Sequence, residues 1–350
     1  MSIEENIRKV TPYTPGEQPQ KKVIKLNTNE CPYPPSPEVV RALSETDWDR
    51  LRLYPDPACE QLVSAIAKHY GVGSAQTFVG VGSDDVLSMC FLTFFAGNKP
   101  VFFPDITYSF YDVWADVYRI PYETKPLNGD FRINAEDYYE ANGGVVIANP
   151  NAPTGIAESL GFIKDILEHN TDSVVIVDEA YIDFGGDSAL RLIDQYENLV
   201  VVRTMSKSRA LAGMRVGYCF ASEQLIKYLN DVKYSVNSYT MNMPGLIAGK
   251  AAIEDTDYFH DIVGRVKKTR EWTSGELKAL GFTFNESQTN FIFAKPPAPY
   301  AASEIFDKLI QNGIYVRYFK KPRIDGYLRI SIGTDDEMQT FINKLKEIML

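Results

Sequence analysis

The chain has 350 residues, of which 45% are hydrophobic and 23% are charged, as expected for a globular protein that can build more than one hydrophobic core. Its formal net charge of -10 disfavours a nucleic-acid partner, which would select a basic surface. No uninterrupted apolar run is long enough to span a bilayer, so we expect no membrane partner.

Cysteine and histidine are scarce and scattered. The four cysteines form no CxxC pair, which favours a reduced cytoplasmic location. The N-terminus also lacks the basic-then-apolar order of a signal peptide. The three histidines show no metal-ligand spacing, so no metal site is expected. With so little histidine, a cofactor is a plausible source of reactivity.

The first residues of the chain predict an arm followed by helices. Residues 1–35 are irregular and proline-rich, which favours an extended arm. Between Pro57 and Tyr70 the apolar residues recur at helical spacing, and Gly71 is expected to end that helix. A further helix is predicted from Asp84 to Phe95, with Ser83 as its cap.

Short apolar segments alternate with helices up to about residue 220. Strands are predicted at 77–81, 100–103, 145–148, 173–177, 199–202 and 216–220. Continuous apolar strands are typical of a mostly parallel sheet that helices cover on both faces. In such sheets, ligands gather at the carboxyl ends of the strands.

The pattern changes after about residue 240. Helices near 245–253 and 258–280 are followed by shorter strands, predicted at 282–284, 290–294, 314–317 and 327–332. We therefore expect a large doubly wound α/β domain over 46–240 and a smaller α+β domain over 241–350. Residues 1–45 are expected to form an N-terminal arm that joins the small domain.

Lys207 is the first candidate for chemistry. It follows an apolar strand and a hydroxyl-rich turn with Thr204 and Ser206, and Arg215 comes after a stretch of small residues. An amine is nucleophilic only when it is neutral, and a lysine in such a turn could hold an aldehyde cofactor as a Schiff base. Alone, a lysine near a strand end is more often a solvated surface group. The other strand ends reverse those odds.

Polar groups follow three more predicted strands. Ser83 and Asp84 open a helix directly after a strand, where backbone amides and the helix dipole favour a phosphate, although an ordinary turn is the commoner meaning. Asp178 ends a buried strand and needs a cationic partner, which a protonated pyridine nitrogen would supply, or else it caps the next helix. Tyr181 could then hydrogen-bond the ring hydroxyl.

An aromatic residue and a turn-rich loop complete the set. Tyr108 could stack on a flat ring, although a core or surface tyrosine is the commoner explanation. The loop 149–155, with the sequence Asn-Pro-Asn-Ala-Pro-Thr-Gly, follows a strand and could be any rigid turn when taken alone.

In this chain order, the features resemble the fold-type I pyridoxal-phosphate enzymes, the aspartate aminotransferase superfamily, from Asn29 to Gly333. The resemblance implies pyridoxal 5'-phosphate as cofactor, with Lys207 as the Schiff-base lysine, Asp178 at the pyridine nitrogen and Tyr181 at the ring oxygen. It also implies contacts to the cofactor's ring and phosphate from Ser83, Asp84, Tyr108, Thr204, Ser206 and Arg215.

One position departs from the superfamily pattern. An asparagine usually precedes Pro-Thr-Gly and hydrogen-bonds the ring oxygen, but Ala152 stands there in this chain. Either Asn151 replaces that asparagine, or Tyr181 holds the oxygen without the usual partner.

Segments outside these motifs resemble the histidinol-phosphate aminotransferase family. They are 26–30, 53–56, 178–184 and 328–334, which include Asn29, Tyr54 and Arg329. The resemblance implies amino transfer from L-histidinol phosphate to 2-oxoglutarate, giving imidazole-acetol phosphate and glutamate. It also implies a homodimer in which Tyr54 reaches the neighbouring subunit's cofactor site. A tyrosine before a proline is otherwise a simple turn residue.

Both amino donors carry an anion, and a guanidinium can bind a carboxylate or a phosphate through two parallel hydrogen bonds. Arg329 matches the family's anion-binding arginine, and Arg317 is a second candidate. The substrate pocket has weaker candidates in Tyr13, Asn29, Tyr234 and Asn237.

Other functions stay open at this point. A related enzyme on the same scaffold, such as an aromatic aminotransferase or a phosphothreonine decarboxylase, would carry the same motifs. A cofactor-sensing regulator would need a DNA-binding segment, for which there is no room before Asn29, and the acidic charge argues against it. A binding protein with a fortuitous lysine is less favoured still.

Overall fold

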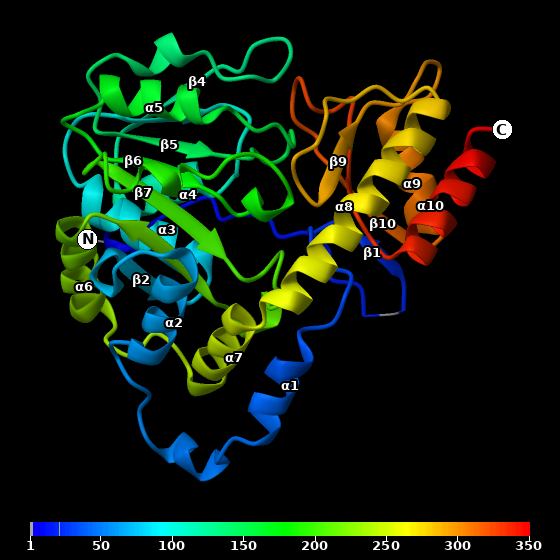
Figure 1. The fold of residues 1–350 in the computed structure, drawn as a ribbon. Coiled ribbons are helices and arrows are strands. Elements are labelled where there is room, and N and C mark those ends of the chain that lie inside the picture. The colour runs from blue at the N-terminus through cyan, green and yellow to red at the C-terminus, as the bar shows by residue number, and fades with distance from the viewer. Residues whose placement is uncertain (1–2, 21) are drawn as a thin grey trace.

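The computed structural model describes residues 3–20 and 22–350, and it contains two β-sheets with helices packed on them (Figure 1). The large sheet has seven strands in the order β2-β8-β7-β6-β5-β3-β4, and the small sheet has four in the order β1-β10-β11-β9. The doubly wound α/β architecture predicted from the apolar strands is confirmed.

The large sheet is mostly parallel, and only β8 runs antiparallel to its two neighbours. Residues of β5 to β8 are buried throughout, as the continuous apolar runs predicted. The seven strands are β2 (Thr77–Gly80), β3 (Val101–Pro104), β4 (Tyr122–Lys125), β5 (Gly144–Ala148), β6 (Val175–Asp178), β7 (Leu199–Thr204) and β8 (Gly217–Ala221).

Alternate residues of each strand enter different hydrophobic cores, because successive side chains point to opposite faces. In β7, Leu199 and Val201 join one core, whereas Val200 and Val202 join the other. The first core also takes residues of α1 (Pro37–Ser44), α2 (Glu60–Tyr70), α5 (Leu160–His169) and α7 (Met243–Glu254). The second takes residues of α3 (Ser83–Phe94), α4 (Tyr111–Tyr118) and α6 (Glu223–Val236).

The small sheet begins with a strand of the arm, because β1 (Ile24–Leu26) pairs in parallel with β10 (Ile314–Tyr318). On its other side, β10 pairs antiparallel with β11 (Leu328–Ser331), and β11 pairs antiparallel with the edge strand β9 (Phe291–Ala294). Three helices pack with this sheet: α8 (Thr256–Ala279), α9 (Ala302–Gln311) and α10 (Asp335–Ile348). In Figure 1 the long helix α8 leads from α7 towards the small sheet.

The structure corrects two local predictions. Gly82, and not Ser83, is the N-cap of α3, and no side chain caps that helix. Segment 282–284 forms only an isolated bridge between Thr283 and Lys295, because the polar residues that follow it do not pair. The end of α2 is as predicted: Gly71 adopts a φ of 71° there, a conformation that glycine reaches at no steric cost.

The predicted boundary between the two domains, at residue 241, falls before α7, although α7 contributes to the first core of the large sheet. Ala248 and Ile253 of α7 are buried against the large domain, so that core reaches past the predicted boundary to the end of α7. Among the helices of residues 3–20 and 22–350, none combines the length and apolar character needed to cross a membrane.

Candidate active site

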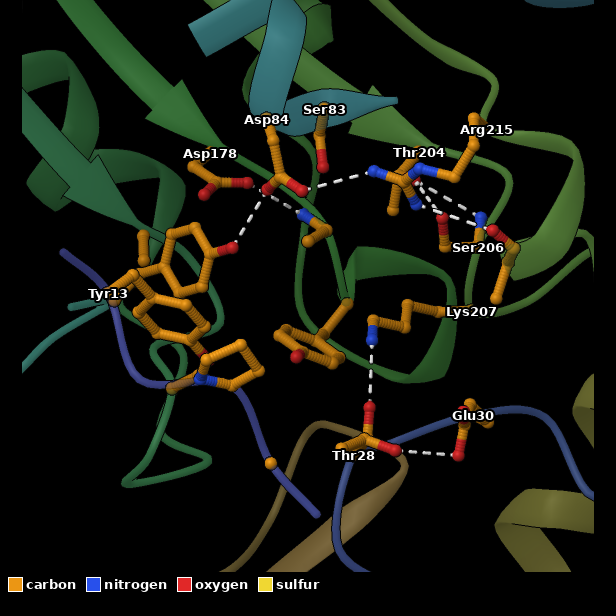
Figure 2. A pocket seen from close by; sticks show the side chains of 18 of the residues that line it. Tyr13, Thr28, Glu30, Ser83, Asp84, Asp178, Thr204, Ser206, Lys207 and Arg215 are labelled. Carbon is orange, nitrogen blue, oxygen red and sulfur yellow. Dashed lines mark hydrogen bonds and ion pairs between the residues drawn. The ribbon is translucent and has the colours of Figure 1, made fainter. Parts of the chain in front are cut away.

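A cavity of about 310 Å³ opens where β5, β6 and β7 end, between the large sheet and the arm (Figure 2). It continues into a second cavity of about 140 Å³ that reaches the small sheet. Both are lined by Lys207, which points across the space towards Thr28 in Figure 2. Most of the residues predicted from the strand ends line these two cavities, namely Ser83, Asp84, Tyr108, Asp178, Tyr181, Thr204, Ser206 and Arg215.

One side of the cavity is built to hold an anion. The N-terminus of α3 lies there, with Ser83 as its first residue, so free backbone N–H groups face the space. Gly82 has a φ of +85°, and a Cβ on it would lie 2.4 Å from Nη2 of Arg215. Only glycine therefore lets this guanidinium approach the helix end. Figure 2 shows Thr204, Ser206 and Arg215 gathered on the same side.

Asp178 is a buried carboxylate that forms no ion pair with any described residue. Its Oδ2 accepts a hydrogen bond from the Tyr111 hydroxyl at 2.9 Å, and its Oδ1 accepts one from the Ala180 amide at 3.2 Å. Burial raises the pKa of Asp178 to about 6, although these two hydrogen bonds act in the opposite direction. A buried carboxylate without a cation fits a protonated ring nitrogen, which would supply the missing charge.

Sequence reasoning missed Tyr111. It is fully buried at the start of α4, and its hydroxyl is the only side-chain donor to Asp178 among the described residues. Its position three residues after Tyr108 is the one signal in the sequence, and that signal does not distinguish a core tyrosine from a hydrogen-bond donor.

The substitution Tyr111→Phe should destabilise the protein without cofactor by about 1–3 kcal/mol above pH 6, because it removes a donor from a buried charged acceptor. The loss should shrink below that pH, where Asp178 is protonated. Unfolding by urea at several pH values measures both effects.

Tyr138→Phe is the matched control, since Tyr138 is equally buried but its hydroxyl has no hydrogen-bond partner in the described part of the chain. Equal losses in the two variants would contradict the role given to Tyr111.

Lys207 is half-buried in the turn after β7. Its Nζ donates a hydrogen bond to the Thr28 carbonyl at 3.1 Å and lies 5.8 Å from the centre of the Tyr181 ring. The Tyr181 hydroxyl accepts a hydrogen bond from Nδ2 of Asn29 at 2.9 Å. The arm thus approaches both the lysine and the tyrosine, which sequence reasoning could not show for Thr28.

The loop with Ala152 settles which of two residues can reach the cavity. The Asn151 amide is held by residues away from the cavity: it accepts from Thr107 at 2.8 Å and donates to the Ile106 carbonyl and to Thr154, both at 3.0 Å. Asn151 does not line the cavity, whereas Ala152 does. Of the two alternatives for the ring oxygen, the geometry therefore favours Tyr181.

Two tyrosines form an aromatic part of the cavity wall. Tyr108 is held by a hydrogen bond from its hydroxyl to Oδ1 of Asp84 at 2.8 Å. Tyr13 comes from the arm, and its ring centre lies 6.4 Å from that of Tyr108 and 4.2 Å from that of Phe110. Both tyrosines line the cavity, so a flat ring between them and the sheet would meet aromatic surface.

At the small-sheet end, two arginines face each other across adjacent strands. Arg317 and Arg329 are direct partners in the register of β10 and β11, and neither pairs with a carboxylate among the described residues. Arg329 donates to the Asn27 carbonyl at 2.9 Å, but its Nε is buried and has no partner among residues 3–20 and 22–350. Burial lowers the pKa of the Arg329 guanidinium. Like charges placed opposite each other are unfavourable unless an anion sits between them.

Three residues predicted for the cofactor or substrate site lie outside the cavity of their own chain. Tyr54 is 81% exposed in the loop between α1 and α2, where its ring stacks on that of Tyr239 with centres 4.5 Å apart. Tyr234 lies on α6 and lines a separate cavity next to β2. Asn237, at the end of α6, does not line the cavity either.

Comparisons with known proteins bear on this geometry. Residues 21–345 match the family model for aminotransferase class I and II. The histidinol-phosphate aminotransferase of Clostridium acetobutylicum is 51% identical over 344 residues, covering 98% of this chain and 97% of that protein. The chain belongs to this family. Its relative from Brachyspira hyodysenteriae, under the same name, is 47% identical and spans 99% and 98% of the two chains.

A solved structure agrees with the family assignment. The histidinol-phosphate aminotransferase of Sinorhizobium meliloti, in complex with pyridoxal-5'-phosphate, matches with a TM-score of 0.86 and 25% identity over 94% of this chain and 91% of that one. A threonine-phosphate decarboxylase of Porphyromonas gingivalis shares the fold, with a TM-score of 0.78, at 20% identity. As a class I and II aminotransferase, this family member is an enzyme that uses pyridoxal phosphate.

The residues of the cavity fit that cofactor. The anion cradle at α3 suits its phosphate, and the unpaired carboxylate of Asp178 suits its ring nitrogen. Lys207 lines the same cavity as these two groups. Among the described residues, Lys207 is the amine in these cavities that could bind the cofactor's aldehyde carbon.

Proposed function

We propose that the enzyme transfers the amino group of L-histidinol phosphate to 2-oxoglutarate, giving imidazole-acetol phosphate and glutamate in histidine biosynthesis. The observation that carries this proposal is the pair Arg317 and Arg329, which lies unpaired at the far end of the cavity from the phosphate cradle. A site with two separate anion-binding ends suits a cofactor phosphate at one end and a substrate anion at the other.

When bound, pyridoxal phosphate supplies an aldehyde that takes up the amino group and a ring that withdraws electrons from the substrate Cα. Lys207 is the one amine of the described residues that lines the cavity, and its Nζ would carry the proton to and from Cα. Asp178 would hold the proton on the ring nitrogen, and Tyr181 would donate to the ring oxygen.

Both amino donors have an anion for the arginines to bind. Glutamate offers a carboxylate and histidinol phosphate offers a phosphate, and a planar guanidinium pairs with either. Arg329 is fixed by the Asn27 carbonyl and by the rings of Phe291 and Phe319, whose centres lie 5.3 and 5.4 Å from its Cζ. Its free Nε is the donor that a substrate oxygen would satisfy.

The test is a half-reaction assay with the cofactor-loaded enzyme and one amino donor at a time. Histidinol phosphate and glutamate should each convert the bound cofactor to its amine form, which changes the visible absorbance, and phenylalanine should be much slower. If phosphothreonine releases carbon dioxide and glutamate does not convert the bound cofactor to its amine form, the enzyme is a decarboxylase and this proposal is wrong.

Replacing Arg329 by methionine should destabilise the bound transition state by about 2–5 kcal/mol for both amino donors, because the substitution leaves the substrate anion unpaired. Arg329→Lys should recover only part of the loss, since an ammonium cannot pair through two parallel bonds. Steady-state kcat/KM for each donor measures these changes.

Arg323→Met serves as the control, because Arg323 pairs with Asp105 at 2.8 Å and lines neither cavity. A similar loss of kcat/KM in that variant would remove Arg329 from the proposed role.

We further propose that the enzyme is a homodimer in which Tyr54 enters the partner subunit's cavity. The segment around η2 (Trp48–Arg52) extends from the body between α1 and α2 in Figure 1. It exposes a group of large apolar side chains, namely Trp48, Leu51, Leu53 and Tyr54, beside exposed Tyr239. Exposed apolar groups of this kind mark interaction surfaces. Since Tyr54 does not reach its own cavity, a second copy is the route by which it could contact a cofactor.

Mixing two inactive variants tests this arrangement. Lys207→Ala and Tyr54→Ala subunits, unfolded and refolded together, should regain activity, because a hybrid dimer contains one cavity with both residues intact. Lys207→Ala mixed with Asp178→Ala should stay inactive, since both residues belong to the same cavity. Recovery in neither mixture, or a monomer in sedimentation, would contradict the proposal.

A cytoplasmic location is also proposed. It is supported by the state of the cysteines, which are all unpaired, with Cys59, Cys90 and Cys219 buried in the cores.

A further inference from the structure

A buried charge cluster lies on the side of β7 away from the cavity, and none of the roles described above uses it. Arg203 is at its centre, with the carboxylates of Glu179 and Asp183 on either side. The side chains of Arg203 and Glu179 are only 7% and 0% exposed. A buried ion pair costs much of its attraction in lost hydration, so stability alone is a weak reason for it.

The cluster forms a continuous series of contacts. Arg203 reaches Oε2 of Glu179 with Nη2 at 2.9 Å and with Nε at 3.1 Å. Its Nη1 lies 3.3 Å from Oδ1 of Asp183. The other carboxylate oxygen of Asp183 accepts a hydrogen bond from the hydroxyl of Ser208, which is itself buried. Two strand ends and the turn after β7 are thereby joined.

The two ends of this series adjoin the two central residues of the cavity. Glu179 directly follows Asp178, and Ser208 directly follows Lys207. Neither Glu179 nor Ser208 lines the cavity. The backbone of the turn that carries Lys207 is therefore tied, through Ser208 and the cluster, to the strand end that carries Asp178.

We propose that Asp183 and Ser208, anchored by Arg203, are positioning residues that hold Lys207 at its place opposite Asp178. They act through the backbone of the turn and contact neither cofactor nor substrate. This inference rests on the proposed role of Lys207 as the residue that binds the cofactor and moves the proton. Displacing a reacting group by about 1 Å can cost about 10²-fold in rate, so a fixed turn has a direct kinetic consequence.

The experiment compares two serine-to-alanine variants from the same cluster. Ser208→Ala removes the contact between Asp183 and the turn. Ser188→Ala removes another hydroxyl of the cluster, which donates to Glu179 at 2.7 Å and accepts from Arg203 at 2.8 Å and from the Leu190 amide at 3.0 Å, but does not adjoin Lys207. The first readout, on the cofactor-free proteins, is the rate at which an amine-reactive reagent labels Lys207, with exposed Lys227 as internal reference.

In Ser208→Ala, the relative labelling rate of Lys207 should change several-fold, and kcat should fall about 10-fold with little change in KM. Ser188→Ala should lower the unfolding temperature to a similar degree while leaving Lys207 labelling as in the wild type. A general loss of packing would affect Lys207 equally in both variants, and that result, or no change in either, would overturn the proposal.

A variant that does not fold and a failure of the proposed function can each be told apart from a failure of this inference. If Ser208→Ala does not fold, Asp183→Asn replaces it, since the amide keeps the shape but loses the charge that faces Arg203. If wild-type Lys207 neither binds pyridoxal phosphate covalently nor supports transamination, the proposed function fails before any variant is compared. The labelling rates of the cofactor-free proteins still report on the cluster in that case.

Discussion

The Lys207→Ala enzyme should lose about 10³-fold or more in kcat, because no other described amine lines the cavity to move the Cα proton. Lys207→Arg should be almost as inactive, since a guanidinium stays protonated and cannot accept that proton. Both variants should retain the fold, because within the described part of the chain the Lys207 amine makes only one hydrogen bond, to the Thr28 carbonyl. Turnover and circular dichroism measure the two effects.

Lys227→Ala is a suitable control, since Lys227 is exposed on α6 and pairs with Asp231. Turnover in Lys207→Ala near the wild-type level would show that another group carries the proton, and the assignment of the cavity would then fail.

The second large effect concerns Asp178→Asn, which should lower kcat by about 10²–10⁴-fold. The amide keeps the shape of the side chain and can still accept from Tyr111, but it carries no charge to hold a proton on the ring nitrogen. Cofactor affinity should fall as well. An unchanged kcat would mean that catalysis does not need the Asp178 charge to keep the ring nitrogen protonated.

The same substitution should stabilise the protein without cofactor. The pKa of Asp178 is raised in the folded state to about 6, above its ordinary value of 3.8. Between these values the folded chain binds more protons than the unfolded chain, so stability falls as the pH rises through that window. Asp178→Asn removes this loss and should gain up to ~3 kcal/mol above pH 6, with no gain below pH 4. Chemical unfolding at the two ends of the window measures the difference.

If Asp178→Asn is more stable than the wild type without cofactor but less active with it, the carboxylate serves catalysis at the expense of stability. Were Asp178→Asn less stable than wild type at every pH, Asp178 would be a structural residue, satisfied by Tyr111 and Ala180 alone.

Much of the large domain could be predicted from the sequence because its buried strands are continuous apolar runs, rich in β-branched residues in β5, β6 and β7. The strand β4 could not, because Tyr122, Glu123 and Thr124 are exposed at the sheet edge and leave no apolar pattern. Ser83 was misassigned as a cap because the cap position is decided by the backbone of Gly82, whose φ is positive.

The candidate site divides along similar lines. Lys207, Asp178 and Ser83 could be found because parallel strands bring their carboxyl ends to one edge, so motifs distant in sequence meet. Tyr111 and Thr28 could not, since their roles depend on contacts across 67 and 179 residues. Asn151 stays an open alternative in the sequence because composition cannot show that its amide bonds to Ile106 and Thr107, which lie 45 and 44 residues earlier in the chain.

The central claim is that Lys207 forms the covalent bond to pyridoxal phosphate. Reduction of the loaded enzyme with borohydride, followed by peptide mass spectrometry, tests it most directly. The phosphopyridoxyl mass should appear on the peptide that contains Lys207 and disappear in Lys207→Arg. A label on another lysine, or none on a protein that has bound the cofactor, would contradict the account.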